Sequence, residues 1–287
     1  MRAIKIFPFF PVVSFCLFFC GISRHDANPE ALSKLASSKQ FDCVGKALEN
    51  GKFIGSGVLI TPRFVLSATH VLMTANQMFT KRRKLNDLEP GDFSLDFNGN
   101  IFKVKRIITY TGRGDYSTET ETDLVLLELD RDVNNIALPG LNTKLNELGT
   151  QVTGVGYGIY GIVNEKGRLK IQNSGVKSAG KNIIDKLAGK EVNGKPAMLQ
   201  FDFDSPLNPA VSKMGSDHPI EMEYTPSGGD SGGGLFREAG GKMELIGILH
   251  STQGDIENFR INGYYGEVSN WTRVSVFTDW IKSSIIK

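Results

Sequence analysis

Gly-Asp-Ser-Gly-Gly-Gly, at residues 229–234, is the stretch of this 287-residue chain that says most about its fold. Glycines let the backbone bend sharply and approach a ligand closely, and the apolar pair Leu235 and Phe236 follows them. Such a bend can direct two amide N–H groups at one point, which is what a developing oxyanion needs. The alternative interpretation of Ser231 is a plain glycine-rich turn. A base and an orienting acid elsewhere in the chain would favour the first interpretation.

Both groups occur upstream of this loop. Residues 55–70 contain two short apolar runs around a Thr-Pro pair, which predict two strands, and they end in His70. Residues 122–129 place Asp123 at the start of a nearly continuous apolar strand. Taken singly, His70 reads equally as a hydrogen-bonded histidine at a strand end, and Asp123 as an ordinary aspartate at a strand start. The chain order His, Asp, Ser is the chymotrypsin order and differs from those of subtilisin and the α/β-hydrolases.

Together these segments resemble the chymotrypsin/trypsin family of serine proteases. Residues 151–158 are similar to the opening strand of the family's second barrel, with Tyr157 where many members have Trp. The resemblance covers roughly residues 41–287 and implies an all-β fold of two antiparallel six-stranded β-barrels with a C-terminal helix. Short strands at regular spacing over residues 41–138 are typical of a barrel, and residues 276–282 carry apolar side chains at helical spacing.

We expect four consecutive segments. They are a signal or targeting segment (1–21), an N-terminal segment (22–40), a first β-barrel with the histidine and aspartate (41–140), and a second β-barrel with the serine and the C-terminal helix (141–287). The first segment combines a basic start with an apolar stretch that is too short and too interrupted by proline to span a membrane comfortably. Residues 159–224 form a longer stretch than in compact family members, and their role is left open.

Cysteine usage points to export without a disulfide framework. Cys16 and Cys20 belong to the targeting segment or its edge, which leaves Cys43 alone, and Val71 stands where animal family members have a cysteine after the catalytic histidine. This pattern fits a bacterial origin better than an animal one. Cys20 also lies in a loose likeness to a lipoprotein box, although the bulky Phe19 beside it argues against one. We expect a secreted, periplasmic or cell-envelope protein, attached to the membrane only if Cys20 is lipidated.

Composition limits the partners. The net charge is +2 at pH 7 and 40% of the residues are hydrophobic, as in an ordinary soluble globular protein, so no nucleic acid partner is expected. The basic run at residues 81–84 is interpreted as a solvated loop. Four histidines and no His-Glu-x-x-His motif offer no ligand set, so neither a metal nor another cofactor is expected. The oligomeric state is left open.

The resemblance implies a mechanism. Ser231 would be the nucleophile, His70 the general base, and Asp123 the group that holds the imidazole tautomer. The backbone N–H groups of Gly229 and Ser231 would form the oxyanion hole. The expected function is a secreted serine endopeptidase that hydrolyses protein and peptide substrates through an acyl-enzyme. The alternative is a catalytically silent homologue that acts as a binding module. An esterase of the α/β-hydrolase type would need its aspartate and histidine after the serine.

Asp230 has two interpretations. In trypsin-like enzymes the acid before the nucleophile pairs with a newly freed N-terminal amine, and Ile22 could supply that amine if the chain were cut after Gly21. In the other interpretation, Asp230 binds local backbone amides and no processing is needed.

The specificity pocket is predicted from the resemblance. Thr225 stands where trypsins carry the aspartate that binds basic side chains, so cleavage after Lys or Arg is not expected. His250, Ser251 and Thr252 follow the strand that normally lines the pocket, and glutamate-specific relatives use a His with Ser or Thr there. Acidic specificity is one hypothesis. The other is that His250 packs structurally near the catalytic triad.

Overall fold

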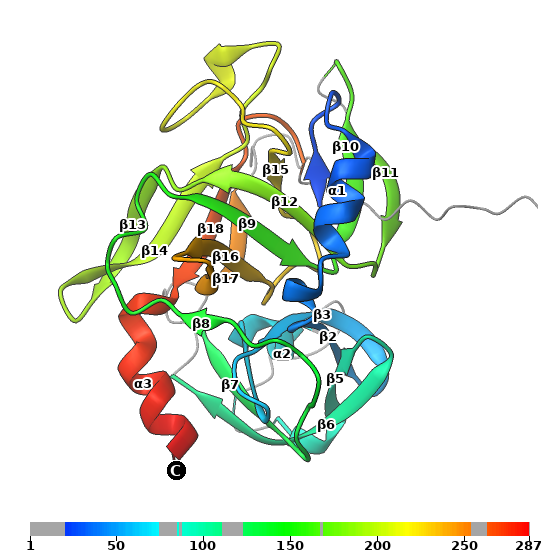
Figure 1. Cartoon of the computed structure of the whole chain (residues 1–287), viewed down its shortest axis with the longest axis vertical. Helices are drawn as coiled ribbons and strands as arrows, with labels where there is room; N and C mark the ends of the chain where they lie inside the picture. The colour runs from blue at the N-terminus through cyan, green and yellow to red at the C-terminus, as the bar shows by residue number, and fades with distance from the viewer. Residues whose placement is uncertain are drawn as a thin grey trace, which may run out of the picture.

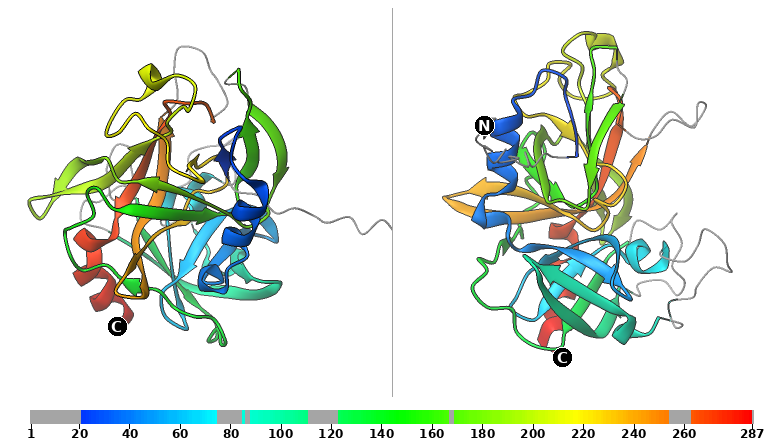
Figure 2. Two further views of the ribbon diagram at one scale, coloured as in Figure 1. Left: turned by 45° about the horizontal axis from the view of Figure 1, so that its top comes forward. Right: turned by 90° about the vertical axis from the view of Figure 1, so that its right-hand side faces the viewer.

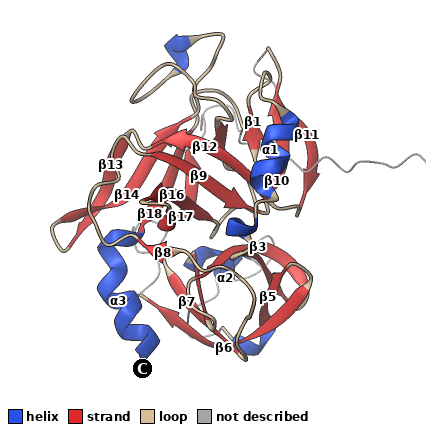
Figure 3. Ribbon diagram, in the orientation of Figure 1, coloured by secondary structure: helices blue, strands red, loops and turns tan. Residues whose placement is uncertain are grey.

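Two β-rich units lie one above the other in the computed structural model of the chain (Figure 1). The structure describes residues 21–74, 85, 88–110, 123–166, 169–253 and 263–286. Residues 1–20 of the predicted targeting segment, with Cys16 and Cys20, and the basic run at 81–84 lie outside the described residues. The fold is mostly strand, with short helices at the periphery (Figure 3).

The lower unit is a closed six-stranded barrel, as expected. Its strands follow the order β2-β3-β4-β7-β6-β5, and every pair of neighbours is antiparallel. Strand β5 alternates buried and half-buried residues, so Phe93, Leu95 and Phe97 fill the barrel interior. The strands are β2 (Val44–Glu49), β3 (Lys52–Leu59), β4 (Phe64–Ser67), β5 (Phe93–Phe97), β6 (Asn100–Thr109) and β7 (Val125–Leu129).

The upper unit is larger than the six-stranded barrel expected for it. Its main sheet has eight strands in the order β12-β9-β16-β17-β18-β14-β13, with β8 added beside β17. The hairpin of β13 and β14, which belongs to the 159–224 stretch, extends this sheet. Among the described strands, β13 pairs only with β14 and therefore forms the edge of the sheet. The strands are β8 (Gly140–Leu141), β9 (Gln151–Gly156), β12 (Ser178–Ile183), β13 (Lys186–Val192), β14 (Lys195–Asp202), β16 (Gly234–Ala239), β17 (Lys242–Gln253) and β18 (Val268–Arg273).

A small four-stranded sheet, in the order β11-β10-β1-β15, completes the upper unit. One of its two inner strands comes from the N-terminal segment: β1 runs parallel to β10 and antiparallel to β15. The two residues of β1, Ile22 and Ser23, are fully buried, although no pattern in the N-terminal segment predicts a strand there. The strands are β1 (Ile22–Ser23), β10 (Ile159–Val163), β11 (Leu169–Ser174) and β15 (Tyr224–Thr225).

Among the residues that the structure describes, three α-helices accompany the strands. Helix α1 (Pro29–Ala36) starts at Asn28, whose side chain accepts hydrogen bonds from two backbone N–H groups of the first turn. Helix α2 (Thr69–Thr74) carries His70, and α3 (Val274–Ile286) is the expected C-terminal helix. Figure 2 shows α1 and α3 on different sides of the molecule. Within the described part of the chain, no helix is long and apolar enough to cross a membrane.

One hydrophobic core joins the two units. It contains the interior of the barrel together with side chains of the upper sheet, such as Val155, Phe236 and Ile248. The rings of Phe41 and Phe236 lie 5.4 Å apart across the junction. Because apolar burial is continuous there, we expect the two units to hold a fixed relation to each other, which a site at their junction requires.

Candidate active site

His70 and Asp123 come together because β4 and β7 are neighbours in the barrel. Ser67 at the end of β4 pairs with Val125 at the start of β7, so the segments that flank these strands lie side by side. The His70 Nδ1 atom lies 2.5 Å from Asp123 Oδ2, and the His70 backbone N–H donates to Oδ1 over 2.8 Å. Both carboxylate oxygens therefore bind the same histidine.

The surroundings of this pair favour an ionised carboxylate. The Asp123 side chain is 1% exposed and that of His70 is 19% exposed. Burial alone would raise the pKa of Asp123, but the hydrogen bonds from His70 and two nearby imidazoles outweigh it and hold the pKa below its usual range. The imidazole is thus oriented from a buried anion toward a partly exposed edge.

The serine loop is held against both units. The Ser56 N–H of β3 donates to the Ser231 carbonyl over 2.8 Å, and the Gly232 N–H donates to the Leu249 carbonyl of β17 over 3.0 Å. Gly232 has φ +78°, and a side chain there would overlap the Ser56 carbonyl and the Ser67 hydroxyl. Ser67 is three residues before His70, so the loop of Ser231 lies against the segment that carries the histidine. Ser231 is a partly exposed residue.

Asp230 is buried and binds groups close to it in space. Its Oδ1 accepts from the Gly158 N–H over 2.7 Å, and its Oδ2 accepts from the Ser227 N–H over 2.9 Å. Burial raises its pKa to about 6, although these hydrogen bonds act in the opposite direction. Ile22 has other neighbours, since it pairs with Gly161 and Thr225. The geometry therefore fits the alternative in which Asp230 binds local amides.

The predicted pocket residues divide into two groups. Thr225 is buried, and its hydroxyl lies 3.3 Å from the Ser269 hydroxyl of β18. Thr252 pairs with Ser269 in the β17–β18 ladder. His250 and Ser251 instead contact each other, with 2.9 Å between His250 Nδ1 and Ser251 Oγ. His250 also lies beside the His70–Asp123 pair, with its ring centroid 6.3 Å from that of His70.

Two buried residues near this pocket were missed from the sequence. Ser269 is the partner of Thr225, and Glu267 lies two residues before it in the chain, with burial raising the pKa of its carboxyl to about 7. Neither residue stands in a motif. The one available signal is that β18 is largely polar (Val-Ser-Asn-Trp-Thr-Arg) and yet fully buried.

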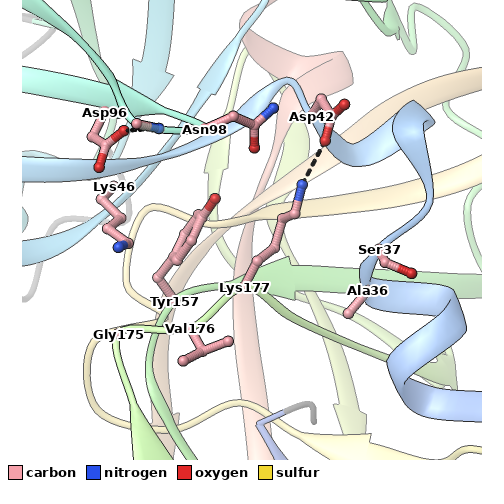
Figure 4. A pocket seen from close by; sticks show the side chains of 11 residues that line it. Ala36, Ser37, Asp42, Lys46, Asp96, Asn98, Tyr157, Gly175, Val176 and Lys177 are labelled. Atoms are coloured by element: carbon pink, nitrogen blue, oxygen red, sulfur yellow. Dashed lines mark hydrogen bonds and ion pairs between the residues drawn. The ribbon is translucent and has the colours of Figure 1, made fainter. Parts of the chain in front are cut away.

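A hollow of about 450 Å³ lies at another part of the junction and contains none of the predicted catalytic residues (Figure 4). Lys177 Nζ lies 2.7 Å from Asp42 Oδ1 at its edge, and Lys46 Nζ lies 5.4 Å from the ring centroid of Tyr157. The Tyr157 N–H donates to the Ser56 hydroxyl over 3.1 Å, and that hydroxyl donates to the Gly229 carbonyl over 3.2 Å. The serine loop is thereby tied to the wall of this hollow. Across the described ranges, no group of three or more His, Cys, Asp or Glu is placed to hold a metal ion.

The fold and the site together define a class: two-unit β proteins in which a His–Asp pair of one unit lies near a glycine-flanked serine loop of the other. Comparison with known proteins makes this specific. The family model described as Trypsin matches residues 36–281. The chain belongs to the trypsin family.

Two similar proteins are human. Granzyme M of Homo sapiens is 27% identical over 192 residues, a stretch that covers 65% of this chain and 65% of granzyme M. The chain thus spans just under two thirds of the length of this curated relative. A solved structure of a mutant of human heparin-binding protein (CAP37) has a TM-score of 0.55 at 19% identity, and the match covers 87% of this chain and 93% of that one. The second likeness supports the fold.

Proposed function

We propose that the protein is an active serine endopeptidase whose nucleophile is Ser231. The observation that carries the proposal is the binding of both Asp123 oxygens to one histidine, 2.5 Å from Nδ1 and 2.8 Å from the backbone nitrogen. An aspartate that accepts the Nδ1 hydrogen leaves Nε2 as the basic nitrogen of the ring. Nε2 then takes the serine proton during attack on the substrate carbonyl and returns it to the leaving amine.

The oxyanion of the tetrahedral intermediate would be bound by the backbone N–H groups of Gly229 and Ser231. Gly229 has φ +95°, a conformation that favours glycine. The hydrogen bonds of the Ser56 hydroxyl to Gly229 and of Asp230 to Gly158 hold the loop in this shape. Losing one oxyanion donor typically costs about 3–4 kcal/mol of transition-state stabilisation. The loop is already ordered in the uncut chain, so we propose that activity does not require a free amine at Ile22.

Substrates would be proteins and peptides whose residue before the scissile bond is not basic. Thr225 and Ser269 present hydroxyls and no carboxylate at the place where a basic side chain would need one. We propose export of the protein, directed by the apolar segment at residues 1–21. The four segments predicted from the sequence remain the proposed domain organisation.

A catalytically silent binding protein is the second candidate. The intact pairing of His70 with Asp123 favours the enzyme, because a protein freed from catalytic selection has no need to bury an aspartate against a partly exposed histidine.

The deciding experiment is labelling of the purified full chain with a fluorophosphonate, followed by peptide mass spectrometry. We expect the label on Ser231, and Ser231→Ala should lose hydrolysis by several orders of magnitude while it unfolds at the same urea concentration. Ser283→Ala, which changes an exposed serine of α3, is the matched control and should label normally. A label on another serine, or roughly a few per cent of wild-type hydrolysis in Ser231→Ala, would refute the assignment. A folded wild-type chain that takes no label would favour the binding protein.

A further inference from the structure

Asp123 has a second histidine next to it. His250 Nε2 lies 3.9 Å from Asp123 Oδ2, the same oxygen that binds His70 Nδ1. The His250 side chain is 14% exposed, so the two rings flank a carboxylate that is almost sealed from solvent. At 3.9 Å the contact is too long for a hydrogen bond. In a buried site, however, the dipole of an N–H group still acts on a nearby charge.

A β-bulge turns His250 toward the aspartate. The register between β17 and β18 shifts between Leu249, which pairs with Trp271, and Ser251, which pairs with Asn270. His250 is therefore the extra residue of β17, opposite no residue of β18. A bulge of this kind bends the strand and gives its extra side chain a new direction. In a regular strand, successive side chains point to opposite faces of the sheet, so the side chain of His250 would point away from the face that Leu249 and Ser251 share.

A chain of hydrogen bonds sets the proton position on His250. Gln200 Nε2 donates to Asn270 Oδ1 over 2.7 Å, so the Asn270 amide nitrogen faces Ser251 and donates to its hydroxyl over 3.3 Å. Ser251 Oγ accepts there, and its own hydrogen is available to His250 Nδ1, 2.9 Å away. A ring nitrogen that accepts leaves the proton on the other one. This arrangement favours the tautomer of His250 that has its hydrogen on Nε2, the nitrogen 3.9 Å from Asp123 Oδ2.

We propose that His250 is a positioning residue of the catalytic site, a neutral imidazole whose Nε2–H keeps Asp123 ionised and directed at His70. Its effect on turnover rests on the proposed protease function. The titratable groups that face His250 from the packed elements are Asp123 before β7 and His70 in α2; Ser251 and Asn270 are its polar neighbours on β17 and β18. Burial, together with His70, outweighs Asp123 and lowers the pKa of His250, so its ring is neutral at pH 7.

This role differs from acidic specificity in what it affects. A pocket histidine binds the substrate, so its loss would raise KM and abolish a preference for acidic residues. A positioning histidine acts through Asp123, so its loss would lower kcat with little change in KM.

The experiment combines ¹⁵N-histidine NMR and kinetics on the full chain. Wild type should show His250 neutral with its hydrogen on Nε2. In His250→Phe, Asp123 interacts with His70 alone, so His70 should titrate at a higher pH. The value of kcat should fall about tenfold or more, because small displacements of catalytic groups have effects of this size. His250→Gln keeps a donor near Nε2 and should recover most of kcat. Ser251→Ala should give mixed tautomers and an intermediate kcat.

The control is His218→Phe, which alters an exposed histidine paired with Asp217 and should leave every reading unchanged. A hydrogen on Nδ1 of His250, or an unchanged His70 titration in both His250→Phe and His250→Gln, would overturn the proposal. So would a rise in KM at constant kcat. If His250→Phe does not fold, His250→Gln and Ser251→Ala give the same decision. If wild type neither labels nor hydrolyses, the protease assignment fails, while the NMR titration still tests the coupling of His250 to His70.

Discussion

Asp123 and Asp230 are both buried, but their surroundings shift the pKa values of the two carboxyls in opposite directions. Asp123 faces two imidazoles, and its pKa is lowered. Asp230 receives only amide and hydroxyl hydrogens, and burial raises its pKa to about 6. The lowered pKa of Asp123 fits the catalytic role proposed for it, whereas the amide hydrogen bonds of Asp230 fit a proposed role in loop geometry. The two residues therefore invite different tests.

Asp230→Asn should loosen the serine loop. Asparagine has one acceptor oxygen where Asp230 uses two, so either the Gly158 or the Ser227 N–H loses its partner. We expect the free energy of unfolding at pH 8 to fall by about 1–3 kcal/mol, and fluorophosphonate labelling to slow. Below about pH 6 the gap should widen, because the raised pKa of Asp230 means that the wild-type protein gains stability when this carboxyl is protonated, whereas asparagine does not titrate. Urea unfolding at both pH values is the measurement.

Asp217→Asn serves as the control for this change, since Asp217 is exposed. Equal stability and equal labelling in wild type and Asp230→Asn would contradict the proposed role of the carboxylate.

At the scale of elements, β1 is a strand of two residues with a large effect on its surroundings. It closes the gap between β10 and β15, and so fixes Thr225 of the predicted pocket. Ile22 packs with Val163 and Phe203 and is fully buried. A strand of this length has no stability of its own, so its position comes from this packing.

Ile22→Ala should therefore destabilise the protein by about 2–5 kcal/mol, the usual cost of truncating a buried isoleucine. Thermal unfolding is the measurement, and Ile101→Ala in β6, where the side chain is 53% exposed, is the matched control. A loss no larger than that of the control would show that β1 is not packed as described. A wild-type chain that labels only when it begins at Ile22 would instead support the pairing of its amine with Asp230.

At the scale of the whole molecule, buried and half-buried carboxyls affect how stability depends on pH. In five carboxyls of the described residues, burial raises the pKa from its ordinary value near 4 to about 6–8: Asp185, Asp204, Glu223, Asp230 and Glu267. The folded protein thus holds more protons than the unfolded chain between about pH 4 and pH 8. Its free energy of unfolding should then fall as the pH rises through this window.

Urea unfolding should accordingly show greater stability at pH 5 than at pH 8. Glu223→Gln should flatten the dependence, because the pKa of Glu223 lies highest of the five, at about 8. That variant carries a constant penalty as well, since Glu223 accepts from two backbone N–H groups, of Asp204 and Ile220. A stability that increases from pH 5 to pH 8 would contradict this reading of the buried carboxyls.

Much of this organisation was accessible from local patterns. The glycines around Ser231, the apolar runs that end at His70 and begin after Asp123, and the helical spacing of residues 276–282 all concern neighbours in the chain. Such patterns report backbone freedom and periodicity, which short segments determine by themselves. They were enough to predict the β fold, the closed first barrel and the C-terminal helix, and to propose the catalytic residues.

Other features depend on how distant segments pack. Three of these features join residues far apart in the sequence. They are the burial of Ile22 between β10 and β15, the pairing of β8 with β17 in the upper sheet, and the hydrogen bond between Asp230 and Gly158. The direction of His250 depends on a single shift of register against β18. One extra residue in a strand redirects a side chain without changing the sequence pattern around it, so it becomes visible only when the neighbouring strand is in place.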